Sequence, residues 1–138
     1  MKRKIRLSDS GALTQSSVRW KMSRSLPDSP TPLLYRNVLF LFKNGGIVTF
    51  LDAETGEVLK RGRIREGVDF YYSSPVAGDD KIYIASETGK VSVLTAKGNW
   101  EVLSTIDLGE EIYATPAIAD GRIYLRTASA LYAFGSRE

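Results

Sequence analysis

The sequence repeats itself at an interval of slightly more than forty residues. A shift of 43 residues maps Pro32 onto Pro75 and Gly46 onto Gly89, and a shift of 41 residues then maps Pro75 onto Pro116. A repeat of about 40–45 residues that contains several short strands is typical of the blades of a β-propeller. The chain is therefore expected to fold as a row of similar small sheets.

Each copy divides into strands and turns in the same order. A proline that follows a small hydroxyl residue opens an innermost strand, where it costs no ladder hydrogen bond; these prolines are Pro32, Pro75 and Pro116. A second strand is expected at Val38–Phe42, Lys81–Ser86 and Arg122–Thr127. A third strand is expected at Ile47–Leu51, Lys90–Leu94 and Ala130–Phe134, and an outer strand at Glu57–Ile64 and Trp100–Asp107.

The strands are rich in Val, Ile, Leu, Phe and Tyr and lack the periodicity of a helix, so the fold class is all-β. We expect a single β-propeller segment of about three four-stranded antiparallel blades, with blades at 30–66 and 67–108 and an incomplete last blade at 109–138. Residues 1–29 are expected to supply terminal strands of another incomplete blade, at Lys4–Leu7 and Val18–Ser23. Because such a strand could complete the last blade of a neighbouring chain, self-association through edge strands is expected.

The composition excludes several classes of catalytic and metal site. The chain has no His and no Cys, which rules out a Ser-His-Asp triad, a cysteine nucleophile and a thiolate zinc site. Any metal site would be built from oxygen ligands, which suit Ca²⁺ or Mg²⁺. No catalytic, cofactor-binding or metal-ligating residue is assigned, and no cofactor is expected.

The basic charge is concentrated near the N-terminus. Residues 1–24 contain seven of the 19 Lys and Arg residues and one acid, Asp9. A basic head can contact nucleic acid or anionic lipid, but the alternation in 2–7 favours a strand with a charged solvent face, so a nucleic-acid partner is not expected. No apolar run approaches about 18 residues, and no apolar segment of roughly 7–15 residues follows Met1, which predicts neither a membrane span nor a secretory signal in this chain.

The repeats resemble the PQQ-like repeat superfamily, and more narrowly the C-terminal blades of bacterial PQQ-binding-like β-propeller repeat proteins. The resemblance is carried by LDAETGEVL at Leu51–Leu59, by ADGRIYL at Ala119–Leu125 and by the small polar–Pro strand openings. It implies full-length relatives of roughly seven or eight blades that are commonly periplasmic or exported. A chain of about three blades would then be a fragment, a split gene product or a self-associating piece.

The same resemblance implies no quinone site in this chain. Quinoprotein members of the superfamily place vicinal cysteines against the cofactor and assemble a calcium-binding cluster from several blades. This sequence has no cysteine and too few blades, so no PQQ-binding residue is carried over.

Four aromatic side chains precede the innermost strands of the second and third copies. The starts of these strands line one mouth of a propeller channel, so the aromatic residues are candidates for a ligand or partner surface; packing between blades is the competing interpretation. They are Phe70, Tyr71, Tyr72 and Tyr113. Trp20 and Trp100 lie in or beside outer strands, and we interpret them as packing between neighbouring blades.

Charged residues provide weaker candidates. Arg61, Arg63 and Arg65 share one face of the expected outer strand by its period of two, which makes them a candidate anion contact; protection of an edge strand is the competing interpretation. The turn at Asp52–Gly56 is interpreted as a carboxylate that caps backbone N–H groups, and the acidic pairs Asp79–Asp80 and Glu110–Glu111 as solvated turns.

Two classes of function follow. The leading interpretation is a non-enzymatic β-propeller binding or scaffold module, closed by self-association, because cofactor-free members of the superfamily present their blades as docking surfaces. The alternative is the C-terminal fragment of a larger exported propeller enzyme, quinoprotein-like or sugar-processing, whose active site lies in other blades.

Overall fold

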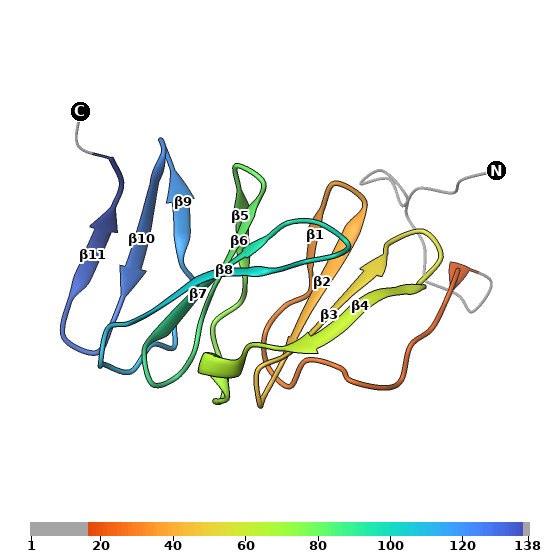
Figure 1. Cartoon of the computed structure of the whole chain (residues 1–138), viewed down its shortest axis with the longest axis horizontal. Helices are drawn as coiled ribbons and strands as arrows, with labels where there is room; N and C mark the ends of the chain where they lie inside the picture. The colour runs from red at the N-terminus through yellow and green to blue at the C-terminus, as the bar shows by residue number, and fades with distance from the viewer. Residues whose placement is uncertain (1–16, 137–138) are drawn as a thin grey trace.

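The computed structural model describes residues 17–136, whose strands form three antiparallel sheets that each run back and forth in chain order (Figure 1). The first blade contains β1 (Leu33–Tyr35), β2 (Val38–Lys43), β3 (Ile47–Asp52) and β4 (Val58–Arg63). The second blade contains β5 (Val76–Gly78), β6 (Lys81–Ala85), β7 (Lys90–Thr95) and β8 (Val102–Asp107). The third blade contains β9 (Ala117–Ala119), β10 (Arg122–Arg126) and β11 (Leu131–Phe134).

This arrangement confirms the expected all-β propeller segment. Each expected strand within the repeats is present, with ends that differ from the prediction by one or two residues. A 3-10 helix, η2 (Arg65–Gly67), follows the first blade. The expected strand Lys4–Leu7 lies outside the described residues. Among residues 17–136, no helix has the length and apolar character needed to cross a membrane.

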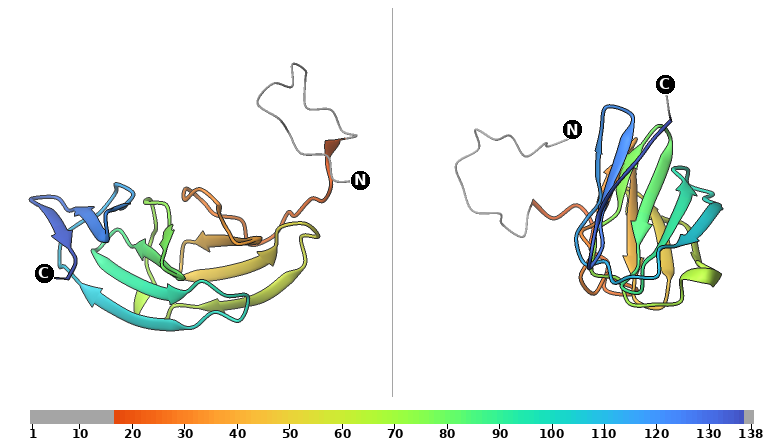
Figure 2. Two further views of the ribbon diagram at one scale, coloured as in Figure 1. Left: turned by 90° about the horizontal axis from the view of Figure 1, so that it is seen from above. Right: turned by 90° about the vertical axis from the view of Figure 1, so that its left-hand side faces the viewer.

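The three blades stand side by side along an arc, with β1, β5 and β9 on its inner side (Figure 2). A repeated hydrogen bond joins them there. The backbone N–H of Thr31 donates to the Ser74 hydroxyl at 2.9 Å, and the backbone N–H of Ser74 donates to the Thr115 hydroxyl at 2.9 Å. Each of these residues precedes the proline of an inner strand. The small hydroxyl residue of the repeat therefore ties each blade to the next.

The hairpins that join inner and second strands turn through two residues with positive φ. These residues are Arg36 and Asn37 in the first blade, Asp79 and Asp80 in the second, and Asp120 and Gly121 in the third. Two consecutive positive φ angles match the twist of the flanking strands, as in a type I′ turn. The predicted turn at Asp79–Asp80 is confirmed, and Asp80 also accepts a hydrogen bond from Arg36 of the neighbouring blade.

The turn between β3 and β4 has the predicted capping role. The Asp52 carboxylate accepts hydrogen bonds from the backbone N–H groups of Glu54 at 2.8 Å and Thr55 at 2.9 Å. The hydrogen bond from Thr55, followed by that from Glu54, holds the pKa of Asp52 below its usual value. The Asp52 carboxylate thus stabilises the backbone of its own turn.

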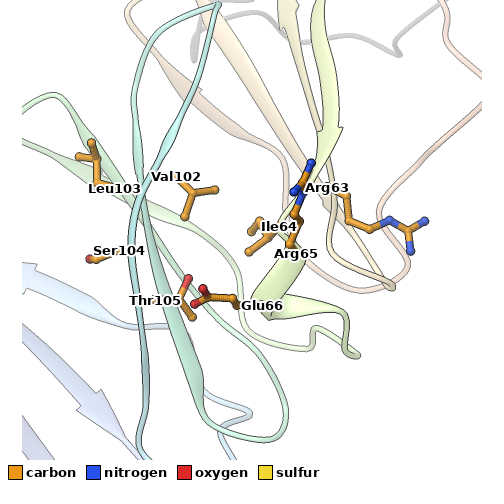
Figure 3. Close-up of a pocket in the computed structure, with 8 residues that line it drawn as sticks. All are labelled: Arg63, Ile64, Arg65, Glu66, Val102, Leu103, Ser104 and Thr105. Atoms are coloured by element: carbon orange, nitrogen blue, oxygen red, sulfur yellow. The ribbon is translucent and has the colours of Figure 1, made fainter.

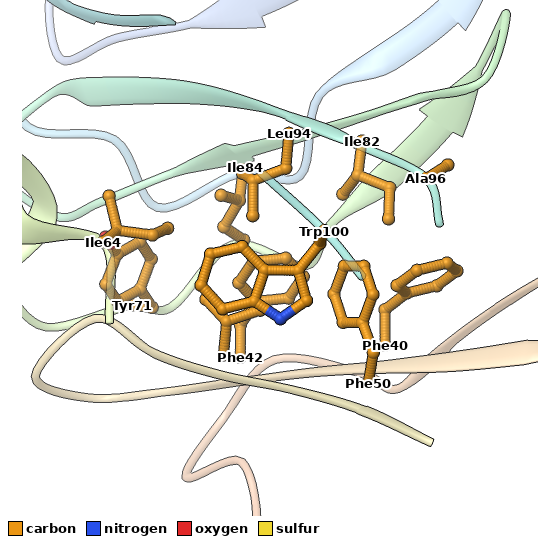
Figure 4. Close-up of a cluster of buried hydrophobic side chains, with 11 residues drawn as sticks. Phe40, Phe42, Phe50, Ile64, Tyr71, Ile82, Ile84, Leu94, Ala96 and Trp100 are labelled. Carbon is orange, nitrogen blue, oxygen red and sulfur yellow. The ribbon is translucent and has the colours of Figure 1, made fainter. Parts of the chain in front are cut away.

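The main hydrophobic core lies between the first and second blades (Figure 4). Phe50 on β3 contacts Phe40 on β2 edge to face, with ring centroids 3.9 Å apart, and lies 5.8 Å from the Trp100 ring. Trp100 belongs to the second blade, and the Lys60 ammonium of the first blade lies 4.6 Å from its ring centroid. The prediction that Trp100 packs between blades is confirmed.

A smaller core joins the second and third blades. Its buried members are Ala85, Val91, Ile112 and Leu125. Side chains of the third blade complete it from the other side, including Tyr132 and Phe134, whose rings are stacked 5.6 Å apart. Each pair of neighbouring blades therefore shares its own apolar cluster, as expected for an array of repeats.

The segment before the first blade corrects one expectation. Val18–Ser23 is not a strand. Instead, Trp20 packs its indole ring against Gly56, where a Cβ would lie 2.7 Å from the ring, and its Nε1–H donates to the Ala53 carbonyl at 3.0 Å. This hydrogen bond holds the segment against the turn of the first blade of its own chain.

We predict that Trp20 stabilises the first blade. Trp20→Ala should lower the free energy of unfolding by about 1–2 kcal/mol, because a half-buried ring and its hydrogen bond are lost together. Trp20→Phe keeps most of the packing and should cost about half as much. Urea unfolding followed by circular dichroism measures both values. Equal stability of Trp20→Ala and the parent would contradict the packing role.

Candidate partner-binding surface

The candidate aromatic residues lie on the two loops that link one blade to the next. Phe70 and Tyr72 project from the loop before β5, and Tyr113 projects from the loop before β9. Their exposed fractions are 56%, 44% and 52%. Both loops lie at the lower edge of the molecule in Figure 1. We refer to Phe70, Tyr72 and Tyr113 as the aromatic surface.

Tyr71 does not belong to the aromatic surface, because its side chain is buried with 1% exposed. Its hydroxyl donates to the Gly67 carbonyl at 2.6 Å, and its backbone N–H donates to the Asn44 side-chain oxygen at 2.8 Å. Burial, followed by the nearby Asp69 charge, raises the pKa of the Tyr71 phenol. Tyr71 therefore anchors the loop in the core and positions its neighbours at the surface.

Tyr72 and Tyr113 come from different linking loops but form one contact. Their ring centroids lie 5.4 Å apart with an angle of 42° between the planes. The Tyr113 hydroxyl donates to the Glu87 carboxylate at 3.1 Å, and the backbone N–H of Glu87 donates to the Phe70 carbonyl at 2.9 Å. The Glu87 hydrogen bond, with the adjacent Glu111 charge, raises the pKa of Tyr113 to about 12. The turn at Glu87 thus connects both parts of the aromatic surface.

Three acidic residues hold the loops in place, and sequence reasoning did not identify their common role. Asp28 accepts from the Asn44 backbone N–H at 3.1 Å, Asp69 accepts from the Thr88 backbone N–H at 3.1 Å, and Glu110 accepts from the Thr127 hydroxyl at 2.6 Å. Each bond connects the segment before an inner strand with the turn between the second and third strands of the same blade. The three acids are spaced at 41 residues, which is the signal that could have revealed them.

The hydrogen bonds lower the pKa of all three carboxyl groups. For Asp28 the main cause is the Asn44 backbone N–H, followed by Lys43; for Glu110 it is the Ser129 hydroxyl, followed by Thr127. Partial burial alone would raise the pKa of Asp69, but hydrogen bonds from the Thr88 side chain and the Phe70 backbone outweigh it. Glu110 is therefore a structural acceptor rather than one half of a solvated acidic pair.

The three candidate arginines do not share one strand. β4 ends at Arg63, and Arg65 lies in η2. The strand ends because the chain turns into η2 after Ile64, where the backbone N–H of Gly67 donates to the Ile64 carbonyl at 3.1 Å. Arg61 donates to the Thr49 hydroxyl at 3.1 Å, whereas Arg63 extends away from β8 (Figure 3).

Arg65 lines a groove of about 350 Å³ between the first and second blades (Figure 3). Glu66 lines the same groove, with Val102 and Thr105 of β8 on the opposite side. A carboxylate next to the guanidinium lowers the attraction for an anion. Within residues 17–136, no group of three or more acidic side chains has a geometry that could hold a metal ion.

The family model described as "Outer membrane protein assembly factor BamB" matches residues 44–136, which is more than half of the chain. The outer membrane protein assembly factor BamB of Shewanella oneidensis is 34% identical over 65 residues. That match covers 47% of this chain and 16% of the relative.

Solved structures show the same fold. BamB from Moraxella catarrhalis superposes with a TM-score of 0.68 at 21% identity, over 85% of this chain and 36% of that protein. The quinohemoprotein alcohol dehydrogenase ADHIIG from Pseudomonas putida HK5 superposes with a TM-score of 0.63 at 14% identity, over 85% of this chain and 20% of that protein. The chain thus spans about a third or less of the length of these proteins.

We predict that Asp69 makes the stability of the chain depend on pH. Because its pKa is lowered in the folded protein, its stabilising effect is present above the ordinary carboxyl pKa of about 4 and is lost as the pH falls through the lower folded value. Asp69→Asn should cost about 1 kcal/mol at pH 7, and its stability should fall less than that of the parent below about pH 4.

Denaturant unfolding at pH 7, 4 and 3 measures this difference. Asp120→Asn is the matched control, since it removes the same charge from an exposed hairpin turn. The pH dependence of the Asp120 variant should follow that of the parent. Parallel pH profiles for the parent and Asp69→Asn would show that the Thr88 hydrogen bonds do not favour the charged carboxylate.

Proposed function

The chain belongs to the family of the outer membrane protein assembly factor BamB, and from this premise we propose that it is a non-enzymatic binding module whose propeller blades dock a protein partner. The Shewanella relative is an outer membrane protein assembly factor. By that analogy, the partner proposed for this chain is a protein that takes part in outer-membrane assembly.

The observation that carries this proposal is the exposed contact between Tyr72 and Tyr113. Two tyrosine rings from different blades lie together at the surface with about half of each side chain accessible. Tyrosine is favoured in protein interfaces because a partner can bury its ring while the hydroxyl keeps a polar contact. Phe70 enlarges the same edge of the molecule with a third exposed ring.

The alternative function is that of a segment of a larger propeller enzyme whose active site lies in other blades. The similarity to the quinohemoprotein alcohol dehydrogenase supports this alternative at the level of the fold alone, since the identity is 14%. The contact between Tyr72 and Tyr113 favours the binding module, because the enzyme alternative assigns no role to exposed rings in this segment. Arg61, Arg63 and Arg65 remain proposed as an anion contact of secondary importance.

A photo-crosslinking experiment tests the binding proposal. A photoreactive phenylalanine analogue placed at position 72 or 113 in living cells of the source bacterium should capture a protein of the outer-membrane assembly machinery, identified by mass spectrometry. The same analogue at position 36, in the β1–β2 hairpin on the opposite edge of the blades, is the control and should not capture it. Equal capture from position 36, or no capture from 72 and 113, would overturn the proposal.

We also propose that the chain associates with itself through edge strands. β8 and β11 are outermost strands of their sheets in the described part of the chain. Leu103 on β8 is 50% exposed and Leu131 on β11 is 72% exposed, and neither strand contains a lysine. Exposed apolar edges without a protecting lysine favour pairing with another strand.

Light scattering behind a sizing column measures this association. The expected result is a discrete multiple of the 15.3 kDa chain mass. Leu103→Lys together with Leu131→Lys should shift the population toward the monomer, because a lysine ammonium protects a strand edge. A monomeric parent protein at tens of micromolar concentration would contradict self-association.

A further inference from the structure

The loops that carry the aromatic surface are acidic. Segments 66–75, 86–89 and 108–116 contain no Lys or Arg, and their acidic residues are Glu66, Asp69, Glu87, Glu110 and Glu111. The nearest bases in sequence, Arg65 and Lys90, belong to η2 and β7. The exposed rings therefore lie in loops whose charged side chains are all acidic.

The acidic residues differ in the number of hydrogen bonds that their carboxylates accept from the protein. Asp69 and Glu110 accept hydrogen bonds from hydroxyl and N–H groups of their own blades. Glu87 accepts only the Tyr113 hydroxyl among the contacts of the described chain, and Glu111 is exposed beside Tyr113. Glu87 and Glu111 are thus the carboxylates that stand next to the rings with capacity for another donor.

We propose that the aromatic surface, together with Glu87 and Glu111, binds an arginine or lysine side chain of an extended segment of the partner protein. This inference rests on the proposed function and names the chemistry of the partner. A cation is attracted both to the face of an aromatic ring and to a carboxylate beside it. Arginine fits best, because its planar guanidinium stacks on a ring while its N–H groups reach a carboxylate.

A purely apolar segment fits this surface less well. Covering Tyr72 and Tyr113 with apolar groups would also remove water from Glu87 and Glu111 without giving the charges a partner, which is costly. An acidic segment would add repulsion between like charges. Charge complementarity therefore selects a cationic segment among the peptides that could cover the rings.

Fluorescence anisotropy with labelled peptides tests the inference. The probe is an eight-residue peptide of alternating arginine and leucine, and its control replaces every arginine by glutamine. The arginine peptide should bind at least tenfold more tightly, and its affinity should fall as salt rises from about 50 to 200 mM because exposed charges are screened. Equal affinity for the two peptides would overturn the inference.

Variants locate the binding site. Glu87→Gln combined with Glu111→Gln should weaken binding about five- to tenfold, and the amide oxygen introduced at position 87 can still accept the Tyr113 hydroxyl. Tyr72→Leu should weaken it about threefold through loss of the ring face. Glu101→Gln, at an exposed site before β8, removes a charge elsewhere and should change affinity less than twofold. An effect of Glu101→Gln as large as that of the double variant would overturn the assignment to this surface.

Circular dichroism of each variant confirms that it is folded before its affinity is compared. The result is separable from the outcome of the crosslinking experiment. Capture of an assembly protein through a segment without Arg or Lys would overturn the cationic partner but leave the proposed function intact. Binding of the arginine peptide without any capture from positions 72 and 113 would overturn the proposed function instead.

Discussion

Packing between blades is the interaction on which the rest of this structure depends. A sheet with apolar side chains on both faces must bury each face against another element. Phe50 does so between Phe40 of its own blade and Trp100 of the next blade. Because Trp100 reaches back from the turn before β8, the second blade completes the core of the first. Trp20 covers the turn at Gly56 of the first blade.

Two polar contacts recur from blade to blade and fix how each blade is placed relative to its neighbour and to its linking loop. One joins neighbouring blades through the hydroxyl residue before each inner-strand proline, as in the bond from the Thr31 N–H to Ser74. The other joins the acid before each inner strand to a turn of its own blade, as in the bond from Thr88 to Asp69. Both contacts hold the linking loops at one edge. Residues at equivalent positions, such as Tyr72 and Tyr113, therefore become neighbours although 41 residues separate them.

Much of this fold could be predicted from the sequence because strand periodicity and turn residues recur in each repeat. The predictions that were wrong concern positions where contacts with distant residues, rather than the local sequence pattern, decide the structure. Val18–Ser23 has the composition of a strand, but the Trp20 hydrogen bond to Ala53 holds the segment against a turn. The arginine alternation continues through Arg65, but β4 ends at Arg63 because the chain turns into the 3-10 helix η2. In the linking loop no periodicity separates buried Tyr71 from exposed Tyr72, so only the structure distinguishes the anchor from the surface.

The position that Tyr71 fills explains why its neighbours are exposed. Ile112 lies 41 residues later and is also buried. Each of these two linking loops therefore places one large apolar side chain in the core. The rings of Tyr72 and Tyr113 are additional to that requirement and leave apolar area in water, which favours association. The carboxylates of Glu87 and Glu111 keep this area hydrated and resist non-specific apolar contacts. A cation on a partner removes that resistance by pairing with the carboxylates, so the groups that keep the surface soluble also determine which segment can cover it.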